Sequence, residues 1–223
     1  MLTYGHLIGE VIRRITGQRL GEFFAAHVAG PLGADFHIGL PPSEFHRVTN
    51  VVPPPLPSDA PPFDPTQLDP NSVAFKTWTN PTMPGPDYHW TEGRRRADIG
   101  AANGHGNARS VARIMSAVTL GGTVDGVRLL GQDAIDLIFE EQANGVDLVL
   151  GVPLRFGIGY GLPNESIPYL PDERICFWGG WGGSLIVMDL GRRMTVSYMM
   201  NNMGSGVIGS SRSETYLKAI YGS

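Results

Sequence analysis

Residues 174–204 read RICFWGGWGGSLIVMDLGRRMTVSYMMNNMG, and this stretch decides the fold. Three runs rich in apolar and β-branched side chains alternate with short turn segments, which predicts three successive strands. The turns are expected at 179–183, where four glycines surround a tryptophan, and at 189–192, which reads Asp-Leu-Gly-Arg. Connections this short join antiparallel strands, because a parallel neighbour needs a long crossover. We therefore expect an antiparallel sheet in this part of the chain.

The segments from residue 92 to the end of the chain alternate between helical and extended patterns. They predict a turn and a helix at 100–122, a short strand and a helix at 127–141, two strands separated by Pro153 at 147–162, and a closing helix at 210–223. Asn107 or Ser110 is expected to cap the helix of 100–122. Helices that flank an antiparallel sheet are typical of the α+β class.

The first 91 residues divide into two parts of different character. In residues 1–50, apolar side chains from Tyr4 to Ile15 recur at helical spacing before Gly17, a second helical pattern follows, and DFHIGLP predicts a short strand. Residues 51–91 begin with a run too rich in proline for a helix or a central strand. We interpret 51–91 as an excursion packed over the body. Residues 1–223 would then form one partial domain, with helices and the sheet at 92–223.

Composition argues against several classes of function. The 223 residues carry a net charge of −4, and the longest basic run is 94–96, expected as a solvated turn, so a nucleic-acid-binding face is not expected. No apolar run reaches the roughly 20 residues of a membrane span, and no signal-peptide pattern is present, which favours a cytoplasmic protein. The single cysteine excludes an internal disulfide. No phosphate-binding loop and no spaced histidine pair occur, so neither a cofactor nor a metal is expected.

The stretch FWGGWGGS at 177–184 is the first candidate site, with Trp178, Gly179, Gly180 and Trp181 at its centre. Glycines here allow another backbone or a ligand to approach closely. Two interpretations are open. One is a bulged turn with packed tryptophans. The other is a strand end whose N–H groups face a ligand.

Three single residues are further candidates. His105 lies between two glycines at the start of a helix, where its ring would either enter a cleft or bond to the backbone. Tyr160 would line a pocket or anchor a strand. Cys176 lies in an apolar run, and we interpret it as a small buried side chain rather than a nucleophile.

Four segments, taken in order, resemble the C-terminal part of the serine β-lactamase-like superfamily, and within it the carboxylesterases related to class C β-lactamases. They are YGHLIGEVIRRITGQRLGEFFAAHVAGPLGADFHIGLP, ANGHGNARSVARIMSAV, EEQANGVDLVLGVPLRFGIGYGL and FWGGWGGSLIVMDLGRRMTVSYMMNNM. The resemblance covers most of the chain. It implies a β-lactamase/transpeptidase-like α+β fold that lacks its N-terminal part.

The family's catalytic parts are a Ser-x-x-Lys motif, a Tyr motif and a Lys-Thr-Gly-like box on a strand, which reads Trp-Gly-Gly in many esterases. The resemblance places this box on Trp178, Gly179 and Gly180. It assigns an oxyanion-donating N–H to Trp181, on what we expect to be an edge strand. His105 and Tyr160 stay candidate substrate-binding residues. The box lacks the basic residue that pairs with a β-lactam carboxylate, which favours ester substrates.

The other catalytic parts do not occur in these 223 residues. No serine has a lysine three residues after it, because Val73 precedes Lys76 and Thr215 precedes Lys218 at that spacing. The family's tyrosine falls just upstream of Met1. We therefore expect a truncated or split serine hydrolase that lacks acyl-transfer activity on its own and acts on a small-molecule ester or amide when complemented.

Without the rest of the fold, a sheet edge and a helix face are expected to be uncovered. Such surfaces invite self-association, an N-terminal-half partner or instability. Two other functions stay open at this point. The chain would be a non-catalytic binding or regulatory module derived from this fold, or an unrelated enzyme that uses His105 or Cys176.

Overall fold

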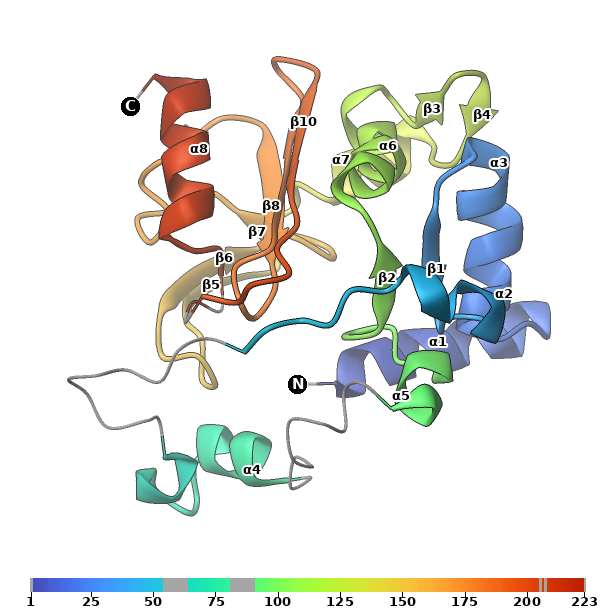
Figure 1. Ribbon diagram of the computed structural model, residues 1–223. Helices are drawn as coiled ribbons and strands as arrows, with labels where there is room; N and C mark the ends of the chain where they lie inside the picture. The colour runs from blue at the N-terminus through green and yellow to red at the C-terminus, as the bar shows by residue number, and fades with distance from the viewer. Residues whose placement is uncertain (1, 54–63, 81–90, 205, 207, 223) are drawn as a thin grey trace. The chain divides into compact units, whose positions relative to one another are not determined.

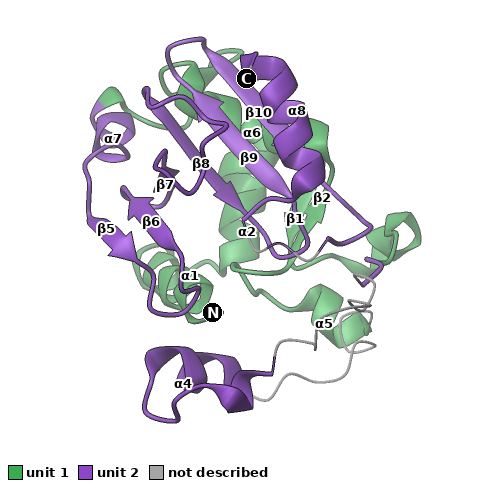
Figure 2. Cartoon of the chain, turned by 90° about the vertical axis from the view of Figure 1, so that its left-hand side faces the viewer, with its two compact units in different colours: residues 1–50, 85–132 green, residues 51–84, 133–223 purple. Residues whose placement is uncertain are grey.

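The computed structural model describes residues 2–53, 64–80, 91–204, 206 and 208–222 (Figure 1). The chain forms two compact units, and each unit combines two segments that are separated in the sequence (Figure 2). One unit contains residues 1–50 and 85–132, and the other contains residues 51–84 and 133–223. That all residues belong to one partial domain stays a prediction.

The second unit contains a six-stranded antiparallel sheet with the order β10-β9-β8-β7-β6-β5. Its strands are β5 (Ala143–Val146), β6 (Pro153–Phe156), β7 (Gly161–Leu162), β8 (Ile175–Gly179), β9 (Leu185–Asp189) and β10 (Met194–Tyr198). Strands that follow one another in the sequence are neighbours in the sheet, which confirms the prediction made from the short turns. In the β8–β9 pair, Cys176 lies opposite Met188 and Trp178 lies opposite Ile186.

The prediction of a strand immediately before Pro153 was wrong in its position. Residues 147–150 form a turn, and β5 precedes them. The Asp147 carboxylate accepts hydrogen bonds from the N–H groups of Val149 and Leu150, at 2.9 and 2.8 Å, and so holds the turn. Pro153 then begins β6, opposite Val146. The first position of a strand is one where proline is tolerated.

The core of this unit is formed by the sheet and the closing helix α8 (Ser211–Tyr221). Its buried residues are Ile167, Tyr169, Leu170, Ile175, Phe177, Leu185, Val187 and Leu217. The side chain of Ser210 caps α8 by accepting a hydrogen bond from the Ser213 N–H. The hydroxyl of Tyr221 donates to the buried Asp189 carboxylate at 3.1 Å, which ties the end of α8 to the end of β9.

The proline-rich excursion is described only in part. Its described residues include a 3-10 turn at Pro65–Gln67 and the helix α4 (Val73–Thr79), which the sequence did not predict. Ser72 caps α4 by accepting a hydrogen bond from the N–H of Phe75 at 3.0 Å. The Trp78 indole donates to the carbonyl of Val149 at 3.3 Å. Residues 54–63 and 81–90 lie outside the described residues, so the packing of the whole excursion stays a prediction.

The first unit is mainly helical. Its helical segments are α1 (Thr3–Thr16), α2 (Leu20–Phe24), a π-helical turn (Ala25–Ala29), α3 (Gly30–Leu32), a 3-10 turn (Pro42–Arg47), α5 (Glu92–Arg96) and α6 (Ala108–Thr119), and α7 (Gln132–Leu137) begins at its last residue. Its strands are β1 (Phe36–Ile38), β2 (Gly104–Gly106), β3 (Thr123–Val124) and β4 (Val127–Arg128). Leu32, Ala117 and Val124 form its buried core cluster. Among the described residues of the chain, no helix has both the length and the apolar character needed to cross a bilayer.

Two sequence predictions in this unit were wrong. Residues 104–106 were expected in a turn but form β2, because the short strand β1 needs a partner and pairs with it in antiparallel register. Arg94 was expected in a solvated turn, yet it lies in α5 with 6% of its surface exposed. Its guanidinium donates to the carbonyl of Ala102 at 3.0 Å, and the buried Asn103 amide donates to the carbonyl of Arg94 at 2.8 Å.

Candidate active site

The glycine-rich stretch forms the connection between β8 and β9. Trp178 and Gly179 end β8, and the four residues from Gly180 make a turn closed by a hydrogen bond from the Gly183 N–H to the Gly180 carbonyl, at 2.9 Å. The Gly180 N–H donates in turn to the carbonyl of Ser184 at 2.9 Å. The sequence prediction of a turn here is therefore confirmed.

Trp181 occupies the second position of this turn. In the part of the chain that the structure describes, its N–H has no hydrogen-bond partner, whereas the N–H groups of Gly180, Gly182 and Gly183 all have one. The side chain of Trp181 is 59% exposed. A turn leaves the N–H of its second residue outside the closing hydrogen bond, so this donor stays available for a ligand atom.

Gly182 is the residue that makes the turn possible. Its φ of +98° lies in a region that favours glycine, and a Cβ at this position would lie 2.7 Å from the Met200 Cε atom. Residues outside the turn also bond to the Gly182 backbone. The Gly182 N–H donates to the carbonyl of Gly206 at 2.9 Å, and the Gly204 N–H donates to the carbonyl of Gly182 at 2.7 Å. The backbone on the C-terminal side of Trp181 is thus fixed by the segment that follows β10.

Sequence reasoning missed this supporting segment. Residues 199–209 read MMNNMGSGVIG, and glycines in such a segment indicate that another part of the backbone approaches closely. The sequence does not show which part of the chain that is. The segment also reaches Ser184, whose Oγ accepts a hydrogen bond from the Met200 N–H at 3.3 Å. The Ser184 side chain therefore helps to join the β8–β9 turn to the segment that follows β10.

The expectation that Trp181 follows an edge strand was wrong. β8 lies between β7 and β9 in the sheet, so it is an interior strand. Its pairing with β7 is limited to one position, Gly161 opposite Phe177. Because β7 contains only two residues, Trp178 and Gly179 extend past it. The end of β8 is therefore paired on its β9 side alone, which leaves it open in the way an edge strand would be.

The Trp178 side chain is half-buried and rests against another aromatic ring. Its ring centroid lies 5.3 Å from that of Phe156 on β6, with the rings tilted. This distance is within the range of favourable aromatic pairs. Tyr160 belongs to the turn between β6 and β7, and its carbonyl accepts a hydrogen bond from the Gly157 N–H at 3.0 Å. It directly precedes Gly161, which pairs with β8.

His105 lies in the other unit, in the middle of β2 and opposite His37 on β1. Its ring is half-buried, and Nδ1 lies 3.2 Å from the carbonyl oxygen of Asn103. Burial lowers the pKa of His105, and the neighbouring Arg95 and Arg94 charges act in the same direction. His105 thus bonds to the backbone, one of the two roles that the sequence left open. Its role in substrate binding stays a prediction.

Cys176 is fully buried in β8, and burial raises the pKa of its thiol to about 12. A thiol in this state has negligible thiolate content near neutral pH, so it is a poor nucleophile. The interpretation of Cys176 as a small buried side chain is confirmed. Within the described residues, no three His, Cys, Asp or Glu side chains gather as metal ligands would.

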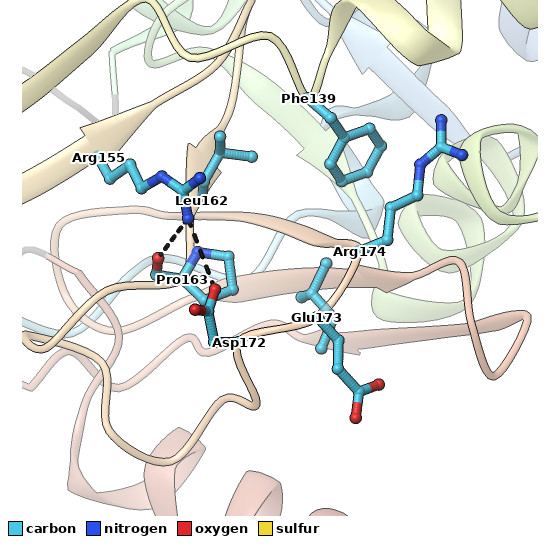
Figure 3. Close-up of a pocket in the computed structure, with 8 residues that line it drawn as sticks. Phe139, Arg155, Leu162, Pro163, Asp172, Glu173 and Arg174 are labelled. Carbon is cyan, nitrogen blue, oxygen red and sulfur yellow. Dashed lines mark hydrogen bonds and ion pairs between the residues drawn. The ribbon is translucent and has the colours of Figure 1, made fainter.

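The unit that contains the sheet has a pocket of about 220 Å³, and Figure 3 shows the residues that line it. It is lined by Phe139, Arg155, Leu162, Pro163, Asp172, Glu173, Arg174 and Ile175. Arg155 forms ion pairs with Glu141 and Asp172, at 2.7 and 3.5 Å, and Arg174 pairs with Asp136. Carboxylates already compensate both guanidinium groups, and no predicted site residue lines the pocket. We do not assign it to the candidate active site.

The fold and the site together define a class of protein. An antiparallel sheet flanked by helices, with a glycine-rich turn at the end of an inner strand, is the β-lactamase/transpeptidase-like α+β fold. The sequence profile of the beta-lactamase family matches residues 1–219, and the chain belongs to this family.

Solved structures and a curated relative support this placement. The chain is 34% identical to a penicillin-binding protein homologue from Caulobacter crescentus, with a TM-score of 0.85 over 99% of this chain and 57% of that one. It is 33% identical to a family VIII carboxylesterase, with a TM-score of 0.81 over 98% of this chain and 56% of that one. It is also 28% identical to the esterase/beta-lactamase LipL of Mycobacterium tuberculosis, over 74% of this chain and 40% of that protein. The chain thus spans little more than half of the solved relatives.

Proposed function

We propose that this chain forms the carbonyl-activating side of a serine hydrolase that cleaves carboxylic esters through an acyl-enzyme. The observation that carries the proposal is the N–H of Trp181 in the turn after β8, which has no hydrogen-bond partner among the described residues. In acyl transfer, attack by a serine hydroxyl moves negative charge onto the carbonyl oxygen of the substrate. A fixed backbone N–H that donates to this oxygen stabilises the tetrahedral intermediate. Trp181 is the donor in this proposal.

The turn is well suited to the role because its geometry is set before any substrate arrives. Gly182 is held on both its N–H and its carbonyl by residues 204 and 206. The Trp178 ring rests on Phe156 and steadies the end of β8. A donor that is already oriented needs no reorganisation during the reaction, and this is the main source of its catalytic effect.

The nucleophile comes from outside these 223 residues in this proposal. No serine of the chain is followed by lysine at the spacing of Ser-x-x-Lys. Ser, Lys and Tyr would be supplied by a further part of the protein or by a second chain. The proposal is supported by the length of the relatives, of which this chain matches 57% and 56% in the two solved structures above. This chain alone is then inactive.

Esters are the proposed substrates. The residues Trp178, Gly179 and Gly180 lack a basic side chain that would pair with a β-lactam carboxylate. Two relatives carry esterase activity in their names, the family VIII carboxylesterase and LipL. An amide substrate would use the same donor.

A chimera tests the proposal. The part of the family VIII carboxylesterase that lies outside its match to this chain is joined to residues 1–223, and hydrolysis of p-nitrophenyl butyrate and of nitrocefin is measured. We expect hydrolysis of the ester. Trp181→Pro removes the N–H but suits the second position of the turn, and it should lower kcat by about 10²–10³-fold.

Trp181→Ala is the matched control, because it keeps the N–H and loses the indole. It should change kcat by less than about tenfold if the backbone donor is what matters. Equal losses in the two variants would contradict the assigned role of the N–H. A folded chimera without ester hydrolysis would favour the alternative, a binding or regulatory module derived from this fold.

A further inference from the structure

Two methionine side chains pack against the backbone of the turn that carries the proposed donor. Gly182 follows Trp181 directly, and a Cβ at Gly182 would lie 2.7 Å from the Cε of Met200. The same Cβ would lie 2.8 and 2.9 Å from the Cγ and Cε of Met203. The ends of both side chains therefore fill the space that a side chain at position 182 would need. The backbone next to the donor is thus packed against two flexible, apolar thioethers.

The main chain that carries these methionines is itself held by hydrogen bonds. The Met200 N–H donates to the Oγ of Ser184, the residue that follows the turn, at 3.3 Å. The Met203 N–H donates to the carbonyl of Val52 at 2.9 Å. Because the main chain is fixed at both methionines, a change in the size or polarity of either side chain acts on its neighbour Gly182.

Both thioethers are open to small reagents. Met200 and Met203 keep part of their surface exposed, whereas Met188 in β9 is fully buried. Cys176 is the single cysteine of the chain, and burial raises the pKa of its thiol, which stays protonated at neutral pH. A peroxide in solution is therefore expected to react with the methionines beside the turn and not with this thiol.

Oxidation by a hydroperoxide changes a methionine side chain without any metal or cofactor. A lone pair of the thioether sulfur attacks one peroxide oxygen, and the O–O bond breaks. The proton on the transferred oxygen passes to the leaving oxygen, which departs as water or an alcohol. The sulfur is oxidised by two electrons, and the peroxide is reduced by two. The sulfoxide that forms is larger and strongly polar, so it disrupts apolar packing of the kind found over Gly182.

We propose that Met200 and Met203 form a peroxide-sensitive modification site that lowers activity by disturbing the turn that holds the Trp181 N–H. This inference rests on the proposed function, because the effect on catalysis requires Trp181 to be the donor. A backbone donor is effective only when its position is fixed before the reaction. It acts on the tetrahedral intermediate more than on the bound ester, so oxidation should lower kcat and leave KM nearly unchanged.

Mass spectrometry of the chain alone tests whether the site is modified. The chain is treated with hydrogen peroxide at neutral pH, and the sulfoxide at each methionine is measured in peptides. We expect Met200 and Met203 to be oxidised at least about tenfold faster than the buried Met188. Equal rates at the three residues would overturn the proposal, since the site would then have no special access.

Hydrogen exchange in the chain alone tests whether oxidation disturbs the turn. Amide exchange of residues 180–184 should become faster after oxidation, because the bond from the Gly182 N–H to Gly206 is weakened. The Met200→Leu/Met203→Leu variant keeps apolar side chains of similar volume that peroxide does not oxidise. Its exchange at 180–184 should not respond to peroxide. An unchanged exchange rate in the oxidised parent chain would contradict the proposal.

The chimera described above tests the effect on catalysis, with p-nitrophenyl butyrate as the substrate. Peroxide should lower kcat of the parent chimera by about 10–100-fold, and a methionine sulfoxide reductase should restore it. The Met200→Leu/Met203→Leu chimera should keep its own kcat within about twofold under the same treatment. Met194→Leu is the matched control, because Met194 is also partly buried but lies opposite Asp189 at the other end of β10. This variant should stay as sensitive as the parent.

The modification site and the proposed function fail separately. An equal loss of kcat in the parent and the Met200→Leu/Met203→Leu chimeras would overturn the proposal, because the sensitive group would lie elsewhere. Faster exchange at 180–184 in the oxidised chain, together with a folded chimera that does not hydrolyse the ester, leaves the modification site standing and refutes the function. Ester hydrolysis that peroxide does not slow does the reverse.

Discussion

Single residues decide the geometry of the turn after β8. Gly182 has a φ of +98° and faces the Met200 and Met203 side chains, whereas a Cβ at Gly180 would meet nothing within 4 Å. The two glycines are two residues apart in one turn, yet only position 182 has a backbone conformation that requires glycine. Trp181 lies between them, at the second position of the turn, and its N–H has no partner within the part of the chain that the structure describes.

This difference predicts the outcome of two alanine substitutions. Gly182→Ala should destabilise the chain by about 1–3 kcal/mol, because it places a Cβ at a positive φ and against two methionines. Gly180→Ala should change stability by less than about 0.5 kcal/mol. Urea unfolding followed by tryptophan fluorescence measures both. Equal destabilisation by the two substitutions would show that Gly182 is not specially constrained.

Cys176 makes stability depend on pH in the alkaline range. Burial raises the pKa of its thiol to about 12, while an unfolded thiol titrates near 8.5. Between these values the unfolded state loses a proton that the folded state keeps, so stability falls as pH rises above the unfolded value. The loss at pH 10 should be about 1–2 kcal/mol.

Urea unfolding at pH 7.5 and pH 10 checks this loss, with Cys176→Ala as the reference. The variant lacks the thiol, so its stability should fall by about 1–2 kcal/mol less over this interval. Tyr169 and Tyr221, whose pKa values burial also raises, titrate in both proteins and cancel in the comparison. If the free energy of unfolding fell equally in the two proteins, the fold would not be keeping the Cys176 thiol protonated.

At the scale of elements, the sequence correctly predicted the helices and strands that depend on residues close together in the chain. The helix at α1 ends at Gly17, with φ +75°, and the strands β8, β9 and β10 follow the alternation of apolar runs and turn residues. Where the outcome depends on contacts far along the chain, the prediction was wrong. β2 exists because β1 pairs with it, and Arg94 is buried because Ala102 accepts its hydrogen bond.

In the candidate site, too, the features that depend on neighbouring residues were predictable and those that depend on distant residues were not. The residues of the β8–β9 turn stand together in the sequence, so their proximity was predictable. The support for Gly182 from residues 204 and 206 was not, because no local pattern connects two glycine-rich loops about 20 residues apart. The interior position of β8 was also missed, since it depends on the pairing of the two-residue strand β7.

The cap of α6 is an element whose stability is testable. The Asn107 side chain accepts a hydrogen bond from the Ser110 N–H at 2.9 Å, so Asn107 is the cap and Ser110 is not. Asn107→Ala should cost about 1 kcal/mol, because the N–H of Ser110 loses its partner. Asn107→Ser keeps an acceptor at the same place and should cost less than about 0.5 kcal/mol. Similar costs for the two variants in urea unfolding would contradict the capping role.

At the scale of the whole molecule, our proposal makes this chain one side of a hydrolytic site whose nucleophile lies outside these 223 residues. The chain belongs to the beta-lactamase family over residues 1–219, and its match to the Caulobacter homologue covers 57% of that protein. The proposed donor, the N–H of Trp181, would act on the carbonyl oxygen of a substrate. In the proposed function, the 223 residues bear the donor but cannot start acyl transfer.

The most direct test is the hydrolysis of p-nitrophenyl butyrate and nitrocefin by the purified 223-residue chain alone. We expect no release of p-nitrophenol and no opening of nitrocefin above the rate in buffer, because no serine in the chain is followed by lysine at the spacing of Ser-x-x-Lys. Turnover that disappears in the Trp178→Ala variant would contradict this expectation, since the chain would then contain a complete active site.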